Sequence, residues 1–221
     1  MAAPKLVIFD CDGVLVDTET LANRRLAQWI GDAGYPITYE QCRKRFCGRS
    51  LSSVHAELKA AGTDIGDDFV ERWYRELPGI FGSGVEKIPH VETFIEAVKA
   101  AGIARCVASS ARTDKMLMTL GQTGLLAHFH DALFSATMVS HGKPAPDLFL
   151  HAASSMGFSP ADCIVVEDSV AGTRAGIAAG MRVFSYHGDP HSDRDGLAQA
   201  GGILFDDMRQ LAGLVPIPHA S

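Results

Sequence analysis

The segment around Asp10 and Asp12 restricts what this chain can fold into more than any other. Four apolar residues, Leu6–Phe9, have the length and composition of a buried strand. The two aspartates follow where that strand would end, and Gly13 comes directly after them. Two carboxylates this close disfavour each other's ionised form, so a divalent cation with oxygen ligands would fit between them. An ordinary strand with an Asp-Gly turn would have the same local sequence, and only the rest of the chain separates these interpretations.

The overall composition excludes several classes of protein. The chain has 221 residues, 47% of them hydrophobic, which suits one large domain or a core domain with a smaller one. Its formal net charge of −6 argues against binding to a nucleic-acid backbone. No apolar run approaches the roughly 18 residues of a membrane span, and no signal-peptide stretch precedes the first strand. We therefore expect a protein that binds neither nucleic acid nor membrane and is a monomer or a small homo-oligomer.

The cysteines indicate a reducing compartment. There are five, an odd number, and they form no Cys-x-x-Cys pair. Neither a disulfide framework nor a zinc site is indicated by this pattern. The predicted localisation is cytoplasmic.

The order of the predicted elements divides the chain into two parts. From Pro89 onward, amphipathic helices alternate with short apolar strands, which is typical of a parallel sheet with helices on both faces. Residues 17–84 contain helical patterns separated by glycines, and the stretch 81–84 would form a hinge. The predicted fold class is α/β, with a Rossmann-like, doubly wound parallel sheet formed by residues 1–16 and 85–221. Residues 17–84 would be an all-helical cap domain inserted after the first strand.

Polar residues recur where the predicted strands end. They are Ser109, Ser110, Lys143, Glu167 and Asp168, of which the lysine lies in a loop rich in glycine and proline. Because the carboxyl ends of parallel strands lie on one edge of a sheet, these side chains would meet Asp10 and Asp12 in one pocket. Carboxylates hold Mg²⁺, and lysine and serine side chains bind phosphate oxygens. Another carboxylate can attack phosphorus or transfer protons. The pattern therefore predicts phosphoryl transfer on a small phosphorylated metabolite.

Four segments, in this order, resemble the motifs of the haloacid dehalogenase superfamily. They are Asp10-Cys11-Asp12-Gly13-Val14-Leu15-Val16-Asp17-Thr18, Val107-Ala108-Ser109-Ser110, Gly142-Lys143-Pro144-Ala145-Pro146-Asp147 and Val166-Glu167-Asp168-Ser169-Val170-Ala171-Gly172. The resemblance covers essentially the whole chain. It points to the subgroup with a helical cap after the first motif, which contains sugar-phosphate phosphatases and β-phosphoglucomutases. The stretch 180–184, with Asp189-Pro190-His191, is similar to 6-phosphogluconate phosphatase-like members.

The resemblance implies a role for each matched residue. Asp10 would be the nucleophile and a Mg²⁺ ligand, and Asp12 the general acid/base, with its backbone carbonyl on the metal. Ser109 and the amide of Ser110 would bind the transferring phosphoryl group, although Ser110 could also be a helix N-cap. The remaining matched residues are Lys143, which would neutralise the phosphoryl oxygens and the nucleophile, Asp168, a metal ligand, and Glu167, a ligand or a residue that orients one.

The resemblance implies a Mg²⁺-dependent phosphatase that hydrolyses a small phosphorylated sugar or sugar acid through an aspartyl-phosphate. Closure of the cap would gate turnover. The cap loop Gly48-Arg49-Ser50 matches in position the loop that sets substrate specificity in this subgroup.

Two alternatives remain open from the residues. β-Phosphoglucomutases typically carry a histidine twelve residues after the nucleophile and an arginine three residues after the cap-loop glycine. Here Ala22 and Leu51 occupy those positions, which favours hydrolysis, although Arg49 could supply a cation from a different point. A non-enzymatic receiver domain or binding module also uses an acidic pocket and a lysine. Such a domain lacks a cap and does not need a general acid beside the phosphorylated aspartate.

Overall fold

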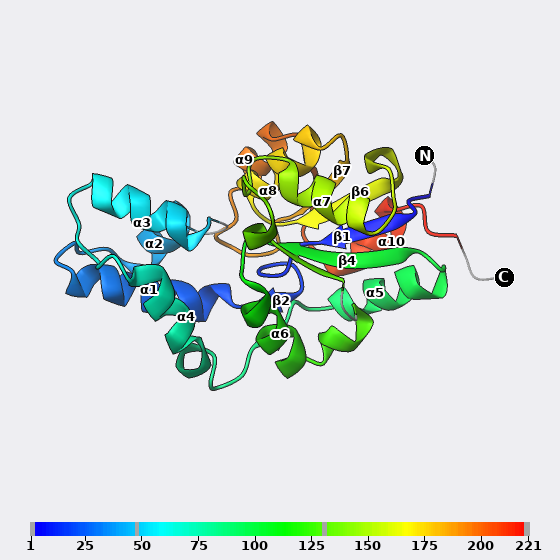
Figure 1. The fold of residues 1–221 in the computed structure, drawn as a ribbon. Helices are drawn as coiled ribbons and strands as arrows, with labels where there is room; N and C mark the ends of the chain where they lie inside the picture. Colours follow the sequence, from blue (N-terminus) through cyan, green and yellow to red (C-terminus); the bar gives the residue numbers. More distant parts are fainter. Residues whose placement is uncertain (1–2, 47–48, 130–131, 219–221) are drawn as a thin grey trace.

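A parallel sheet forms the centre of the protein. The computed structural model describes residues 3–46, 49–129 and 132–218. Within these ranges the sheet has six strands (Figure 1). In spatial order they are β5 (Leu133–Ser135), β4 (Ala104–Ser109), β1 (Leu6–Phe9), β6 (Cys163–Glu167), β7 (Arg182–Tyr186) and β8 (Ile203–Phe205). Every neighbouring pair is parallel, so the predicted α/β class with a doubly wound parallel sheet is confirmed.

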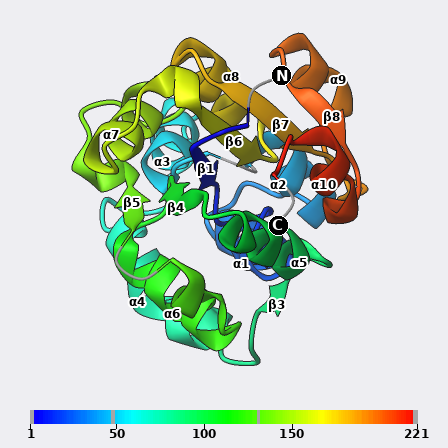
Figure 2. The ribbon, with the colours of Figure 1, turned by 90° about the vertical axis from the view of Figure 1, so that its right-hand side faces the viewer.

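Strand β1 is apolar at every position because both of its faces are buried. Val7 and Phe9 belong to one hydrophobic cluster, which includes side chains of α5 (Val91–Ala100) and α6 (Thr113–Gln122). Leu6 and Ile8 belong to the other, with α7 (Asp147–Ser155) and α8 (Val170–Ala178). Figure 2 shows the sheet between these two helical layers. Since β1 pairs with β4 on one side and β6 on the other, its carboxyl end lies at the topological switch point, where such sheets bind ligands.

Four helices form a lobe beside the sheet (Figure 1). They are α1 (Glu19–Asp32), α2 (Tyr39–Phe46), α3 (Leu51–Ala60) and α4 (Phe69–Ile80). An aromatic cluster packs this lobe, with the Trp29 ring centre 5.8 Å from that of Phe69 and 5.6 Å from that of Trp73. The chain enters and leaves the lobe through the antiparallel pair β2 (Val16–Asp17) and β3 (Glu86–Lys87). These helices lie within residues 17–84, where the cap was expected. That the cap is a separate domain remains a prediction.

The element bounds differ from the predicted ones in a few places. Helix α4 was expected to end at Leu77 but continues past Pro78 to Ile80, because a proline in the last turn removes only one N–H from the helix. The pair β2–β3 and the helices α9 (Arg194–Gln199) and α10 (Leu211–Leu214) were not expected. Short 3₁₀ helices complete the described chain: η1 (Leu125–His128), η2 (Ala136–Met138), η3 (Pro160–Asp162) and η4 (Met208–Gln210). Among the described residues, no helix has the length and apolarity needed to span a membrane.

Candidate functional site

The polar residues predicted from the strand ends meet at one edge of the sheet. Asp10 directly follows β1, and its backbone N–H donates to the carbonyl of Val166 in β6 at 2.9 Å. Ser109 and Glu167 are the last residues of β4 and β6. The site is therefore built where the three central strands end, and the parallel register of these strands brings the remote segments together.

Lys143 reaches this edge from the loop before α7. Its Nζ lies 2.6 Å from Asp10 Oδ1 and 2.8 Å from Glu167 Oε1, and it donates to the carbonyl of Ala108 at 3.1 Å. The side chain is only 2% exposed. Burial opposes its charge, but Asp10 and Glu167 raise the pKa of Lys143 above its ordinary value. The site therefore contains a permanent cation held between two acids.

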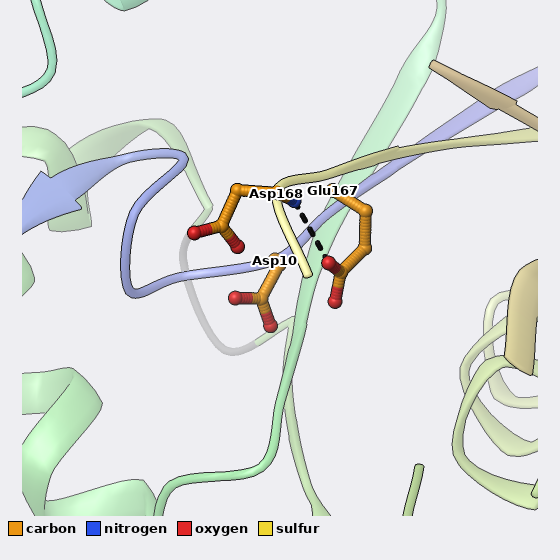
Figure 3. Close-up of side chains that lie close together, drawn as sticks. All are labelled: Asp10, Glu167 and Asp168. Atoms are coloured by element: carbon orange, nitrogen blue, oxygen red, sulfur yellow. Dashed lines mark hydrogen bonds between the residues drawn. The ribbon is translucent and has the colours of Figure 1, made fainter. Parts of the chain in front are cut away.

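Asp10, Glu167 and Asp168 bring carboxylate oxygens within 4.8 Å of one another (Figure 3). Burial, with a smaller contribution from the charge of Glu167, raises the pKa of Asp10 to about 7 against the opposing effect of Lys143. Burial and the neighbouring Glu167 and Asp10 raise the pKa of Asp168 well above its ordinary value. One lysine thus does not neutralise this cluster, which is an environment that a further cation would stabilise.

Glu167, the last residue of β6, and Asp168, which follows it, have different surroundings. Glu167 Oε1 accepts from Lys143, and Oε2 accepts from the backbone N–H groups of Asp168 at 2.8 Å and Ser169 at 2.6 Å. Among the described residues, no group donates a hydrogen bond to the Asp168 carboxylate. A Cβ on Gly13 would lie 2.0 Å from Asp168 Oδ2, so only glycine leaves room for this carboxylate. Glu167 is already fully engaged, whereas Asp168 has oxygen available to a ligand.

Asp12 lies outside this acidic cluster. Its Oδ1 accepts from Thr18 Oγ1 at 2.5 Å, and its Oδ2 lies 2.8 Å from Lys115 Nζ. The expected contact of its backbone carbonyl with a metal remains a prediction. Lys115, in the first turn of α6, was not among the predicted site residues. A lysine at a helix start is usually solvated, and nothing in its local sequence indicates otherwise.

The two serines after β4 differ in their contacts. Ser109 is buried, and its Oγ accepts from the N–H of Ala111 at 3.1 Å, which leaves the hydroxyl proton to donate elsewhere. Ser110 lines the cavity above the strand ends. The N-cap of α6 is Arg112, so the interpretation of Ser110 as the helix N-cap is wrong.

A cavity of about 100 Å³ lies between the strand ends and the helical lobe. Arg49 and Ser50 of the predicted specificity loop line it, and Gly48 lies outside the described residues. Ser50 caps α3 by accepting from the N–H of Ser53. The Arg49 guanidinium pairs with Glu57 and donates to Ser53 Oγ at 2.7 Å. Its charge is therefore balanced within the lobe, which weakens the view that it supplies a free cation.

The comparisons with known proteins agree with this geometry. Residues 4–180 match the haloacid dehalogenase-like hydrolases. The chain belongs to this family. Its sequence is 35% identical over 194 residues to the 6-phosphogluconate phosphatase of Escherichia coli strain K12, a match that covers 87% of this chain and 86% of that protein.

Two solved structures of haloacid dehalogenase-like proteins have the same fold. One, from Agrobacterium tumefaciens, is 32% identical, covers 96% of this chain and 97% of its own, and has a TM-score of 0.81. A family hydrolase from Deinococcus radiodurans R1 is 26% identical, covers 99% and 100%, and has a TM-score of 0.76; its structure contains bound phosphate and sodium. The predicted family membership is thus confirmed, while the roles of individual residues remain proposals.

Proposed function

We propose that this hydrolase is a Mg²⁺-dependent phosphatase that acts on a small phosphorylated sugar or sugar acid, with Asp10 as the nucleophile. One observation carries the proposal: a buried carboxylate, Asp10, lies 2.6 Å from a buried lysine and within reach of two further acids at the switch point of the sheet. The similarity of this chain to the 6-phosphogluconate phosphatase of Escherichia coli supports the proposal.

The chemistry of the acidic cluster fits a hard divalent cation. Asp10 and Asp168 offer carboxylate oxygens that would hold the cation, and substrate phosphate oxygens and water would supply further ligands. We propose that Glu167 orients Lys143 and the backbone of Asp168, since both of its oxygens are engaged. When bound, Mg²⁺ would offset the negative charge of the phosphoryl group and hold it in position.

Each reaction step is assigned to a residue of the site. Asp10 Oδ1 accepts from Lys143, and among the described residues no donor reaches Oδ2, which is therefore available to attack phosphorus. The ester P–O bond breaks, and the departing oxygen takes a proton from Asp12. Asp12 then takes a proton from water, whose oxygen attacks the aspartyl-phosphate and releases Asp10 and phosphate. Lys143 and the Ser109 hydroxyl stabilise charge on the phosphoryl oxygens.

An adjoining groove gives the rest of the substrate a place to lie. The cavity of about 100 Å³ lies over the strand ends, so we place the phosphoryl group there. Arg49 and Ser169 also line an adjoining groove of about 700 Å³, whose exposed cations include Lys44 and Arg174. We place the sugar chain in this groove, where Lys44 or Arg174 can pair with an acidic end group; the lining also holds four acids, of which Asp189 pairs with Arg43.

A phosphoryl-transfer isomerase of the β-phosphoglucomutase type is the alternative within this family. Ala22 and Leu51 both line the cavity, so the two positions face the site but provide neither an imidazole nor a guanidinium. Hydrolysis is therefore preferred. A receiver or binding-module role is disfavoured by the second aspartate and the cavity beneath the helical lobe.

The proposal is tested by measuring phosphate release from a panel of phosphorylated metabolites in the presence of Mg²⁺. The panel includes gluconate 6-phosphate and glucitol 6-phosphate, which differ only in the end group. We expect turnover of sugar phosphates that chelation abolishes reversibly, with a several-fold higher kcat/KM for the acid, the size of one solvated ion pair.

The Asp10→Asn variant should be inactive on every substrate of the panel. If glucose 1-phosphate is isomerised with a bisphosphate activator while no ester is hydrolysed, the mutase assignment replaces this one. Phosphate release that persists in Asp10→Asn would contradict the assigned nucleophile.

A further inference from the structure

A second lysine, largely but not fully buried, contacts the second aspartate of the site. Lys115 Nζ lies 2.8 Å from Asp12 Oδ2 and 5.6 Å from the centre of the Phe81 ring. The side chains of Lys115 and Asp12 are 12% and 16% exposed. Thr18 Oγ1 donates to the other carboxylate oxygen of Asp12. Both oxygens of Asp12 are therefore held by side chains from different elements, one before α1 and one in α6.

The Lys115 side chain is held in one position and largely out of water, and both constraints cost free energy. A lysine removed from water loses hydration and rotamer freedom, so its position needs a specific partner. Although burial opposes the charge, the pKa of Lys115 is raised above its ordinary value by Asp12 and by Glu19. Lys115 therefore remains a cation, and its attraction keeps the Asp12 carboxylate at one place in the cavity that both residues line.

We propose that Lys115 is a positioning residue for Asp12 and acts on proton transfer to the leaving group rather than on binding of the phosphoryl group. The inference rests on the phosphatase function proposed above. A general acid must lie within hydrogen-bond reach of the oxygen it protonates, and a small displacement lowers the rate steeply. Lys143 serves the nucleophile Asp10, and Lys115 serves the proton donor Asp12.

The different roles of Lys143 and Lys115 follow from where the electron pair and the proton go in the first step. As the ester P–O bond breaks, its electron pair stays on the sugar oxygen, which takes the proton that Asp12 carries. The Asp12 carboxylate formed in this way remains beside the Lys115 ammonium, which neither gives nor takes a proton. Lys115 therefore matters most when the leaving oxygen needs a proton, and least when the leaving group departs as a stable anion.

The test compares an alkyl with an aryl phosphate in the Lys115→Met variant. The sugar phosphate with the highest turnover has a basic leaving oxygen, whereas p-nitrophenyl phosphate releases a stabilised phenolate. We expect the single-turnover rate of ester cleavage to fall on the order of 10- to 100-fold for the sugar phosphate. For p-nitrophenyl phosphate it should fall far less, and the substrate concentration that half-saturates this cleavage step and its Mg²⁺ dependence should be unchanged for both substrates.

Three comparisons separate positioning from general damage. Lys99→Met, which replaces an exposed lysine of α5, should leave both rates unchanged. Asp12→Asn should show the same leaving-group dependence to a greater degree, and adding Lys115→Met to it should cause no further loss. If Lys115→Met does not fold, as judged by its thermal unfolding, Thr18→Val supplies the test with a smaller effect in the same direction.

The possible results are distinct. Equal loss on both substrates would show a purely structural role, and a raised KM with unchanged cleavage would show substrate binding; either overturns the proposal. Additive loss with Asp12→Asn would overturn it as well. If the wild-type protein cleaves neither phosphate, the proposed function itself fails, before any variant is compared.

Discussion

At the scale of single residues, the site combines two buried acids and a partly buried one with a lysine that contacts the two buried acids. Lys143 pairs with Asp10 and Glu167, and Asp168 receives no hydrogen bond from the described residues. The pKa of Asp10 is raised to about 7 by burial and by Glu167, against the attraction of Lys143. The metal-free protein therefore holds protons that the unfolded chain would release.

This excess of bound protons predicts a pH-dependent stability. Because the carboxyl of Asp10 binds its proton more tightly when folded, it stabilises the metal-free protein most at low pH. That contribution is lost as pH rises from the ordinary value of 3.8 to about 7. The free energy of unfolding should fall by at most about 4 to 5 kcal/mol over this window, at about 1.4 kcal/mol per pKa unit. Denaturant unfolding in a chelator measures it.

Mg²⁺ and one substitution serve as controls for this pH dependence. Mg²⁺ binds the ionised acids of the folded state, so it should restore stability at the high end of the window. Asp10→Asn should reduce the fall of the unfolding free energy with pH. Asp195→Asn changes a carboxylate whose side chain is 87% exposed, so this variant should show the same fall as the wild-type protein. A fall that persists unchanged in Asp10→Asn would show that another group causes it.

Much of the residue-level site was predictable because motif residues follow strand ends. Asp10, Lys143, Glu167 and Asp168 lie together as their sequence positions imply, since the carboxyl ends of parallel strands lie on one edge of the sheet. Lys115 was not predictable. Its burial depends on the packing of α6 beside Phe81 and Asp12, which are distant in sequence. The pairing of Arg49 with Glu57 also depends on where two helices of the lobe meet.

At the scale of elements, the first turn of α8 holds the side chain of Glu167, the last residue of β6, in position. A Cβ on Gly172 would lie 1.7 Å from Glu167 Oε1, so the helix can approach this carboxylate only with glycine at that position. Ser169 caps the same helix by accepting from the N–H of Gly172 at 3.0 Å. The helix start and the acid side chain therefore depend on each other.

Gly172→Ala should displace Glu167 and, through it, Lys143. We expect a loss of stability of about 1–3 kcal/mol, as for other overpacked sites, together with a large fall in kcat. Gly121→Ala is the matched control, because a Cβ there meets no heavy atom within 4 Å. It should leave activity unchanged and stabilise α6 by up to about 1 kcal/mol. If Gly172→Ala and Gly121→Ala unfold at the same temperature and release phosphate at the same rate, the close approach of α8 to Glu167 is contradicted.

The long elements were predictable from their periodicity, and the shortest ones were not. Strand β1 and helix α1 have bounds within one residue of those expected from their apolar patterns. Strands β2 and β3 contain two residues each, too few for any period to appear. Helices α9 and α10 contain six and four residues and are held by tertiary packing, through Leu197 and Leu211, both fully buried.

At the scale of the whole molecule, two ion pairs among the described residues join the helical lobe to the elements around the sheet. Glu71 of α4 pairs with Arg112 at the N-cap of α6, and Arg43 of α2 pairs with Asp189 after β7. The N–H of Arg112 also donates to the hydroxyl of Tyr74 at 3.2 Å. These contacts hold the lobe over the cavity, so they should favour the closed arrangement in which water is excluded from the site.

Removing one acid from each pair should shift the protein toward open arrangements. The exposed Glu71–Arg112 pair should contribute about 0.2–1 kcal/mol, whereas loss of Asp189 takes a partner from Arg43, whose side chain is 6% exposed, and should cost more. The double variant Glu71→Gln/Asp189→Asn should therefore raise the open population by at least several-fold. We expect a higher KM, a smaller change in kcat, and a larger radius of gyration in solution scattering. Glu96→Gln, which removes a pair with exposed Lys99, is the control. Unchanged scattering and KM in the double variant would show that these pairs do not control closure.

The central claim is that Asp10 becomes phosphorylated during turnover, and one measurement tests it most directly. The protein is mixed with Mg²⁺ and the sugar phosphate that it hydrolyses fastest, quenched with acid during the first turnover and treated with borohydride, which reduces an aspartyl-phosphate to homoserine. Peptide mass spectrometry should then find homoserine at position 10, and none in a sample without substrate. Rapid phosphate release with an unmodified Asp10 throughout the first turnover would contradict the account.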